Sequence, residues 1–336
     1  MLQLASLAAG SAALSVACGS APSPRAGFSG SGRAASRVSR VVLIRSEDRV
    51  AGTRAAIDRL RPEGLAGRSV FLKPNVNTAD PAPAATDPGL LEALVQELRN
   101  AGAGAITVGD RSGMAETREA MASKGVFRLA ERYGLQALVL DELDREGWQL
   151  VASEGTHWPR GFAFARPALE AGALVSTCCL KTHRFGGHFT LSLKNTVGLV
   201  AKTVPGDPHD YMRDLHTSPH QRLMIAEINQ AAAPALVLLD GVEAFVRGGP
   251  EAGVKARPGV ILAGSDRVAV DVVAIALLRS LGTTAAVAEG SIWQLEQIRR
   301  AVDLGLGAAG ADQIEIVTVD PAGQRMADAL RTIIAA

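Results

Sequence analysis

Short apolar runs alternate with helix-like segments from Val38 onward, and this alternation is the feature that most constrains the fold. Continuously apolar runs are typical of strands buried on both faces of a parallel sheet. We expect strands at residues 41–44, 69–72, 105–108, 137–140, 173–178, 235–239, 260–263 and 314–319. We expect helices at residues 50–60, 88–100, 116–133, 190–199, 220–231, 267–281 and 291–303. The predicted fold class is α/β, a mainly parallel sheet covered by helices on both faces in Rossmann-like layers.

The chain has 336 residues, a length that suits one large domain or two intimate ones. We predict a single α/β domain over residues 38–336, with irregular insertions around residues 145–165 and 200–218. Within the first insertion, residues 148–165 are expected to form a short antiparallel pair.

The first 37 residues differ in composition from the rest of the chain. Residues 1–18 form a short apolar run that ends at Cys18, and residues 19–37 form a linker rich in Ser, Gly and Pro. This pattern resembles an export signal with a lipobox-like end and a flexible linker, and its sequence is similar to the back half of a twin-arginine leader. We therefore expect a true start upstream of Met1 and an exported protein, periplasmic or held at the membrane only by an N-terminal lipid anchor. The alternative is a leader without function, which would leave the protein in the cytoplasm.

Charge and cysteine content exclude several classes of protein. Lys and Arg number 35 against 34 Asp and Glu, and only 4% of residues are aromatic, so we expect no nucleic-acid partner. The three cysteines form no CxxC pair, so no iron–sulfur cluster is expected from this chain alone.

The stretch from Val175 to His220 carries most of the chemical functionality of the chain. Five of the six histidines lie here, among lysines, aspartates and Asn195. The run Gly186–Gly187 permits a tight backbone turn in the middle of this stretch. We interpret this concentration as a site.

Several expected strands end in polar residues that are unusual in turns. Ligands of parallel α/β sheets bind outside the carboxyl ends of the strands, so these side chains are expected to share one edge. We predict a ligand-binding set of Lys73, Asn75, Asp110, Asn195 and Asp240. The alternative is that these residues only form turns.

Lys181, His183 and Lys194 form the predicted catalytic set. Lys181 and His183 leave one strand two residues apart, so in extended geometry they point to the same side. A fold back at the glycine pair would aim Lys194 at the same volume. Neighbouring ammonium groups repel each other, so such a site should bind an anion or lower the pKa of a lysine.

The histidines also permit a divalent metal site, for which His183, His188 and His209 are the candidate ligands. Two alternatives stay open: anion binding or catalysis by Lys and His without a metal, and solvated loop histidines. Asp271 stands within an apolar helical segment, four residues after Arg267. It forms either a surface pair with that arginine or a buried carboxylate that reaches the site.

Five segments together resemble the DUF-362 family, a domain of unknown function. They are Phe71–Asn75, Cys179–His183, Ser192–Gly198, Leu239–Val242 with Gly249–Pro250, and Ala263–Asp266 with Ala269–Asp271. The resemblance covers nearly everything from Val41 to Val319. Some relatives carry ferredoxin modules and others twin-arginine leaders, but this chain has no ferredoxin cysteines. The resemblance implies the fold and no particular reaction.

Two functions follow from these observations. The first is an enzyme, metal-assisted or not, that acts on a small anionic substrate, with the lysines holding negative charge and a histidine serving as base or ligand. The second is a binding protein that captures an anionic solute or cofactor without turnover. A titrating histidine or a metal with an open position would favour the enzyme, and fixed, fully bonded donors would favour the binding protein.

Overall fold

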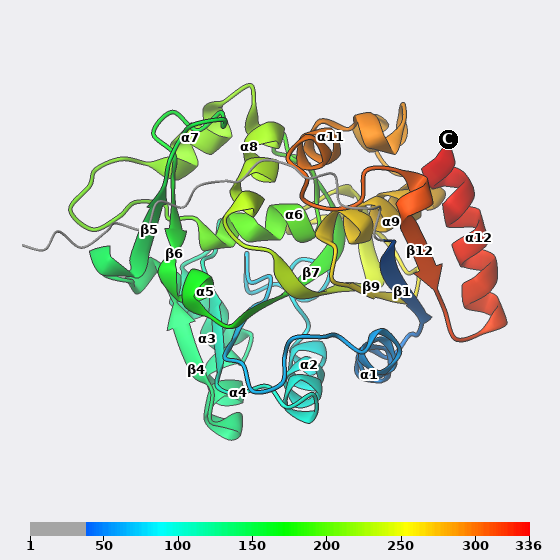
Figure 1. Ribbon diagram of the computed structural model, residues 1–336, viewed down its shortest axis with the longest axis horizontal. Helices are drawn as coiled ribbons and strands as arrows, with labels where there is room; N and C mark the ends of the chain where they lie inside the picture. Colours follow the sequence, from blue (N-terminus) through cyan, green and yellow to red (C-terminus); the bar gives the residue numbers. More distant parts are fainter. Residues whose placement is uncertain (1–37) are drawn as a thin grey trace, which may run out of the picture. The chain divides into compact units, whose positions relative to one another are not determined.

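A computed structural model describes residues 38–336, at whose centre lies one large sheet (Figure 1). The strand order is β12-β1-β11-β9-β7-β2-β3-β4, with β10 added beside β9 and β8 beside β7. The strands are β1 (Ser39–Arg45), β2 (Val70–Lys73), β3 (Ile106–Asp110), β4 (Gln136–Val139), β7 (Ala173–His183), β8 (His188–Thr190), β9 (Pro234–Gly248), β10 (Gly253–Ala256), β11 (Val260–Gly264) and β12 (Ile314–Val317). The predicted leader and linker, residues 1–37, lie outside the described residues.

Most neighbouring strands along this order are parallel. The run β9-β7-β2-β3-β4 is parallel throughout, and β1 is parallel to β12. Within this order only β11 is antiparallel to its neighbours, β1 and β9, while the added strands β10 and β8 are antiparallel to β9 and β7. Apolar clusters cover both faces of the sheet, which explains why its strands are continuous apolar runs. The predicted fold class is confirmed.

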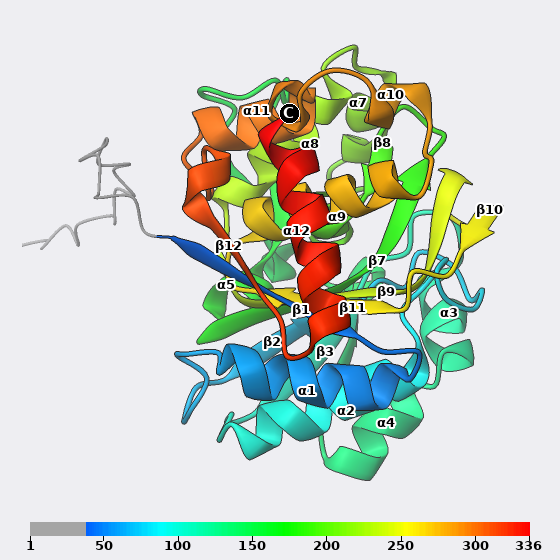
Figure 2. The same cartoon turned by 90° about the vertical axis from the view of Figure 1, so that its right-hand side faces the viewer.

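Helices lie on both faces of the sheet (Figure 1). One face carries α1 (Arg49–Leu60), α2 (Pro88–Asn100), α3 (Thr117–Ser123) and α4 (Val126–Tyr133). The other carries α6 (Ser192–Asn195), α9 (Arg267–Ser280), α11 (Glu296–Asp303) and α12 (Pro321–Ala335). Helix α9 is buried from Arg267 to Leu278, because it packs on the sheet while α12 covers it from outside (Figure 2). No helix of residues 38–336 combines the length and apolar character needed to cross a membrane.

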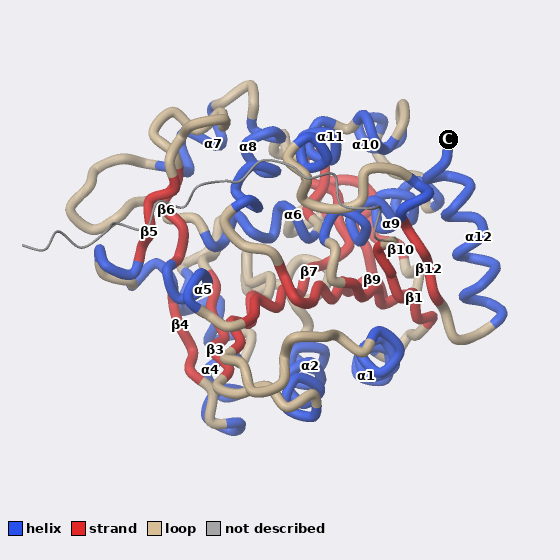
Figure 3. The backbone as a smooth tube through the Cα atoms, viewed as in Figure 1, coloured by secondary structure: helices blue, strands red, loops and turns tan. Residues whose placement is uncertain are grey.

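A third apolar cluster lies beside the sheet, at the segments expected to be irregular insertions. Here β5 (Trp148–Val151) and β6 (Phe162–Ala165) form the expected antiparallel pair (Figure 3). The cluster packs Trp158, Phe162 and Phe164 against Leu215 and its neighbours. The remaining helices are α5 (Arg166–Glu170), α7 (Tyr211–Thr217), α8 (Gln221–Glu227) and α10 (Ala285–Ala288).

Several elements differ from the expected boundaries, and three of these differences have a clear local cause. The helix expected at 116–133 is two helices, because Gly125 takes a φ of 75° between α3 and α4. The strand expected to end at residue 239 continues to Gly248, since it pairs with β10 beyond β11. Helix α12 was not expected, although Asp320 caps it and Pro321 stands at its first position.

Candidate functional site

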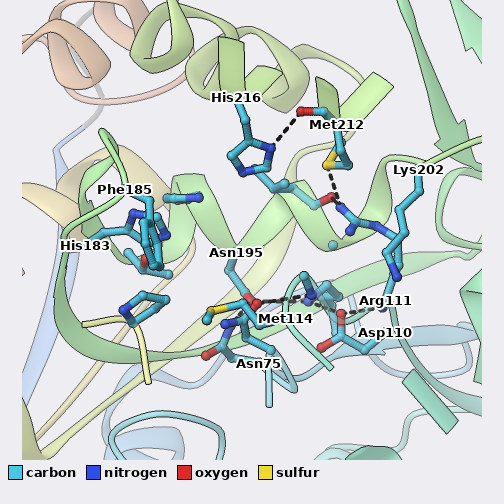
Figure 4. A pocket seen from close by; sticks show the side chains of 18 of the residues that line it. Asn75, Asp110, Arg111, Met114, His183, Phe185, Asn195, Lys202, Met212 and His216 are labelled. Atoms are coloured by element: carbon cyan, nitrogen blue, oxygen red, sulfur yellow. Dashed lines mark hydrogen bonds and ion pairs between the residues drawn. The ribbon is translucent and has the colours of Figure 1, made fainter. Parts of the chain in front are cut away.

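A cavity of about 350 Å³ lies at the carboxyl ends of β2, β3 and β7 (Figure 4). Seven of the site residues proposed from the sequence line it: Lys73, Asn75, Asp110, Lys181, His183, Lys194 and Asn195. They come from three strand ends and from the short helix α6, which follows the Gly186–Gly187 turn and the strand β8. The structure therefore brings both sides of the glycine turn to one place, as the sequence predicts.

A buried ion pair forms part of the cavity floor. Lys73 Nζ lies 2.6 Å from Asp110 Oδ1, and both side chains are only 2% exposed. Burial lowers the pKa of Lys73, while the charge of Asp110 opposes that shift. A Cβ on Gly198 would lie 2.6 Å from Asp110 Oδ1 and 2.7 Å from Lys73 Cε. Only glycine therefore lets the backbone after α6 lie directly on this pair.

A hydrogen-bond network fixes the remaining floor residues. Lys181 Nζ donates to Asn75 Oδ1 at 2.8 Å and to the carbonyl of Ala84. Asn75 Nδ2 donates to Asn195 Oδ1 at 3.1 Å, and Asn195 Nδ2 donates to Ser176 Oγ at 2.9 Å. Each amide thus uses both its oxygen and its nitrogen. The orientation of Lys181 is set by bonds within the protein.

Lys194 differs from the other lysines of the cavity. Its side chain is buried to 8% exposure, and no hydrogen bond or ion pair holds its ammonium group within residues 38–336. Burial, together with the charges of Lys181 and Arg111, lowers the pKa of Lys194 to about 8. The glycine turn makes room for its stem, because a Cβ on Gly187 would lie 2.7 Å from Lys194 Cε.

His183 lies against the same turn. A Cβ on Gly187 would also lie 3.2 Å from its Nδ1, a buried atom without a hydrogen-bond partner among the described residues. Burial and the charges of Lys194 and Lys181 lower the pKa of His183 far below its usual range. The imidazole is therefore neutral at physiological pH and offers the cavity a neutral polar ring.

Asp271 holds the helix that carries Lys194. Its carboxylate accepts the backbone N–H groups of Ser192 and Leu193, at 2.7 and 3.0 Å, and so caps the start of α6. The side chain is fully buried, and burial raises the pKa of Asp271 to about 7. Of the two interpretations drawn from the sequence, the burial of the carboxylate is observed, but Asp271 does not line the cavity and contacts it only through α6.

Replacing Asp271 with Asn should flatten the pH dependence of stability between about pH 4 and pH 7. The folded state holds the Asp271 proton more tightly than the unfolded chain, because its pKa in the folded state is about 7 against an ordinary value of 3.8. Unfolding therefore releases a proton in this window, and the Asp271 contribution to stability falls by about 4 kcal/mol as the pH rises. Urea unfolding at the two ends of the window measures the slope.

Asp48→Asn is the matched control for this experiment. Asp48 accepts two backbone N–H groups at the start of α1, at 2.8 and 3.1 Å, but its side chain is exposed. This variant should keep the wild-type slope. Equal slopes for wild type and Asp271→Asn would show that Asp271 does not bind its proton more tightly in the folded state.

The cavity lining also includes basic side chains outside the predicted set, among them Arg111, Lys202 and His216. Arg111 is buried, and its guanidinium donates to the carbonyls of Val197 and Val200 at 2.7 Å each. Its position directly after Asp110 at a strand end was the available signal. Lys202 belongs to the irregular segment that follows α6, where no periodic pattern fixes a side chain's direction, and His216 belongs to the short helix α7 beyond it.

Three predicted site residues lie elsewhere. Asp240 does not line the cavity, because β9 continues past it to Gly248 and its carboxylate instead pairs with Arg49 of α1 at 2.7 Å. His188 faces His183 across the β7–β8 ladder, outside the cavity lining. His209 pairs with Asp214 at 2.9 Å.

The metal site expected from His183, His188 and His209 is therefore not assembled. Within residues 38–336, no three His, Cys, Asp or Glu side chains are grouped so that they could hold a metal ion. The physical reason is that the side chains of His188 and His209 do not line the cavity, and that His209 is paired with Asp214. The prediction of this ligand set was wrong.

The cavity lining carries an excess of positive charge. Its cations are Lys73, Arg111, Lys181, Lys194 and Lys202, and its carboxylates are Asp110 and Asp210. With the histidines neutral, the lining has three more positive than negative charges. Such a cavity attracts anions, and the low dielectric of its buried floor strengthens that attraction.

The chain is thus an α/β protein with a cationic cavity at the carboxyl edge of its parallel strands. Residues 70–276 match the family described as a domain of unknown function, DUF362, and the chain belongs to that family. A thylakoid-associated protein of Synechocystis sp. is 27% identical over 254 residues, which cover 72% of this chain and 75% of that protein.

Two solved structures are also similar in part. The lactate racemase apoprotein from Thermoanaerobacterium thermosaccharolyticum has a TM-score of 0.40 and 16% identity, over 61% of this chain and 50% of that one. A protein from Thermotoga maritima has a TM-score of 0.42 and 15% identity, over 66% of this chain and 55% of that one. The chain therefore spans about half the length of these solved proteins.

Proposed function

We propose that this protein is an enzyme that binds a small anionic substrate in the cationic cavity and transfers a proton through Lys194. The observation that carries this proposal is the state of Lys194 itself. It lines the cavity, it is buried, and among the described residues nothing bonds its ammonium group. A group without a protein partner is available to a ligand.

The chemistry of proton transfer suits a lysine in this environment. With its pKa lowered to about 8, Lys194 exists in comparable amounts as amine and ammonium slightly above neutral pH. A general base or acid works best when its pKa lies near the working pH. The amine would accept a proton from the bound substrate, while Arg111 and Lys181 stabilise the negative charge that remains.

A binding protein without turnover is the second candidate. The observation in its favour is that bonds within the protein hold Lys73 and Lys181 in place, as a pure binding site would hold its donors. The two candidates differ in whether Lys194 titrates near neutral pH, so the protonation of Lys194 is the property to measure.

Chemical labelling of Lys194 tests the proposal. Trinitrobenzenesulfonate is an anion that reacts only with neutral amines, and mass spectrometry of digested protein reports the rate at each lysine. We expect the Lys194 rate to rise with pH with a midpoint near pH 8, and inorganic phosphate to slow it by competing for the cavity. Lys255 on β10 is exposed and outside the cavity, so phosphate should not protect it.

The result separates the two candidates. Phosphate protection with a midpoint near pH 8 supports the enzyme. If phosphate binds but Lys194 shows no midpoint below about pH 10, close to a free lysine, the site is a binding site without a titrating base. An unprotected Lys194 would refute both candidates.

A further inference from the structure

The mouth of the cavity carries exposed apolar side chains. Phe185 and Met114 are each 47% exposed, and both line the cavity. In residues 38–336 only four other large hydrophobic side chains are as exposed, and none of them lines this cavity. Figure 4 shows Phe185 beside His183 on one side, with Met212 across the cavity from it. Apolar exposure that gathers at one opening is typical of a ligand site.

The buried charged side chains lie deep in the cavity, and the exposed apolar side chains lie near its opening. Lys181 is 0% exposed and Asn195 2% exposed, so the polar network forms the floor. Phe185 and Met114, at 47%, form the rim. A ligand that places its anionic group on the floor can therefore extend its other end to these two side chains.

Phe185 is held in place at the rim. The guanidinium of Arg184 lies over its ring, 4.3 Å from the centroid, and Arg184 Nη1 donates to the Gly249 carbonyl at 2.9 Å. On the other side of the turn, Arg222 Nη1 donates to the Gly186 carbonyl at 2.9 Å. Hydrogen bonds from Arg184 and Arg222 therefore hold the turn on both sides. The Phe185 ring is ordered before a ligand binds, and this lowers the entropic cost of binding.

The cavity is larger than a bare inorganic anion requires. A volume of about 350 Å³ corresponds to roughly ten water molecules of the bulk liquid, several times what a phosphate or acetate ion displaces. A small ion on the floor would leave the rim in contact with water.

We infer that the substrate is an amphipathic anion, with a carboxylate or phosphate head on the cationic floor and an aromatic or other apolar body against Phe185 and Met114. This inference rests on the proposed function, because it assumes that the floor binds the anionic group. A carboxylate ligand and a phosphate ligand would share this arrangement, a charged head joined to an apolar body.

Two matched pairs of probes test the inference by calorimetric titration: acetate with phenylacetate, and inorganic phosphate with phenyl phosphate. In at least one pair, the aromatic member should bind at least tenfold more tightly, which is about 1.4 kcal/mol. The pair that shows binding identifies the head group. In the variant Phe185→Ala/Met114→Ala the advantage should fall to about threefold or less, because the ring loses the apolar surface that it buries.

Leu150→Ala is the control, since Leu150 is 58% exposed on β5, away from the cavity, and its loss should leave the tenfold advantage unchanged. If both members of each binding pair bind equally and the double variant behaves like wild type, the inference is wrong while the cationic floor stands. If no probe binds, the proposed function and the inference fall together.

Discussion

Replacing Lys194 with Met should make the folded protein more stable at pH 7, by about 3 kcal/mol, while weakening its binding of inorganic phosphate roughly a hundredfold. The pKa of Lys194 falls from 10.5 to about 8 on folding, so the folded state holds the charged form at a cost. Methionine keeps the apolar stem and removes that charge. Urea unfolding measures the stability, and phosphate titration measures the affinity.

The pH dependence gives this prediction a second check. The cost of the charge is fully present below about pH 8 and disappears as the pH rises towards 10.5, where both states lose the proton. The advantage of Lys194→Met should therefore fall below about 1 kcal/mol near pH 10. Lys255→Met, which removes an exposed lysine, should change neither property. A variant less stable than wild type at pH 7 would mean that Lys194 has a partner in solution.

Breaking the Lys73–Asp110 pair should have the opposite effect on stability. Asp110→Asn leaves the charge of Lys73 buried and unpaired, and such a loss costs about 3–5 kcal/mol. The double variant Lys73→Met/Asp110→Asn should recover part of that loss, because no isolated charge is left. The free energy of unfolding of the wild type, both single variants and the double variant, measured by heat or urea, gives a double-mutant cycle for this pair.

A more exposed ion pair provides the comparison for this cycle. Lys202 Nζ lies 2.8 Å from Asp141 Oδ2, but its side chain is 38% exposed. Lys202→Met should cost less than about 1 kcal/mol, because water screens the pair. If Asp110→Asn costs no more than Lys202→Met, the floor of the cavity is more hydrated than its burial indicates.

The parallel sheet and the floor of the site were predictable because each depends on a local pattern. Apolar runs mark the strands, and the polar residues that end them, Lys73, Asp110 and Lys181, meet at one edge as parallel strands require. Lys194 could be added because a glycine pair marks the turn that brings it back. These inferences need only the spacing of apolar residues, the direction of the strands and the position of one turn.

The errors arose where a tertiary partner decides the outcome. Asp240 ends an apolar run, yet β9 continues beyond it because it pairs with β10. Its carboxylate forms an ion pair with Arg49, from a helix that is distant in the sequence. His188 and His209 are near Lys194 in the sequence, but their side chains do not line the cavity, and Asp214 pairs with His209. Lys202 reaches the cavity from an irregular segment, so no sequence period could have placed it.

The position of β1 has a consequence for the order in which the chain can fold during synthesis. Strand β1 is the first element described, but its two neighbours are β11 and β12, which pair Val41 with Gly264 and Ser39 with Ile314. Contacts across such long separations form late. A nascent chain that has emerged only as far as α8 can assemble the parallel strands β2, β3, β4 and β7. Strand β1 cannot yet pair, because β11 and β12 have not been synthesised. The carboxyl-terminal quarter of the protein therefore decides when its amino-terminal strand joins the sheet.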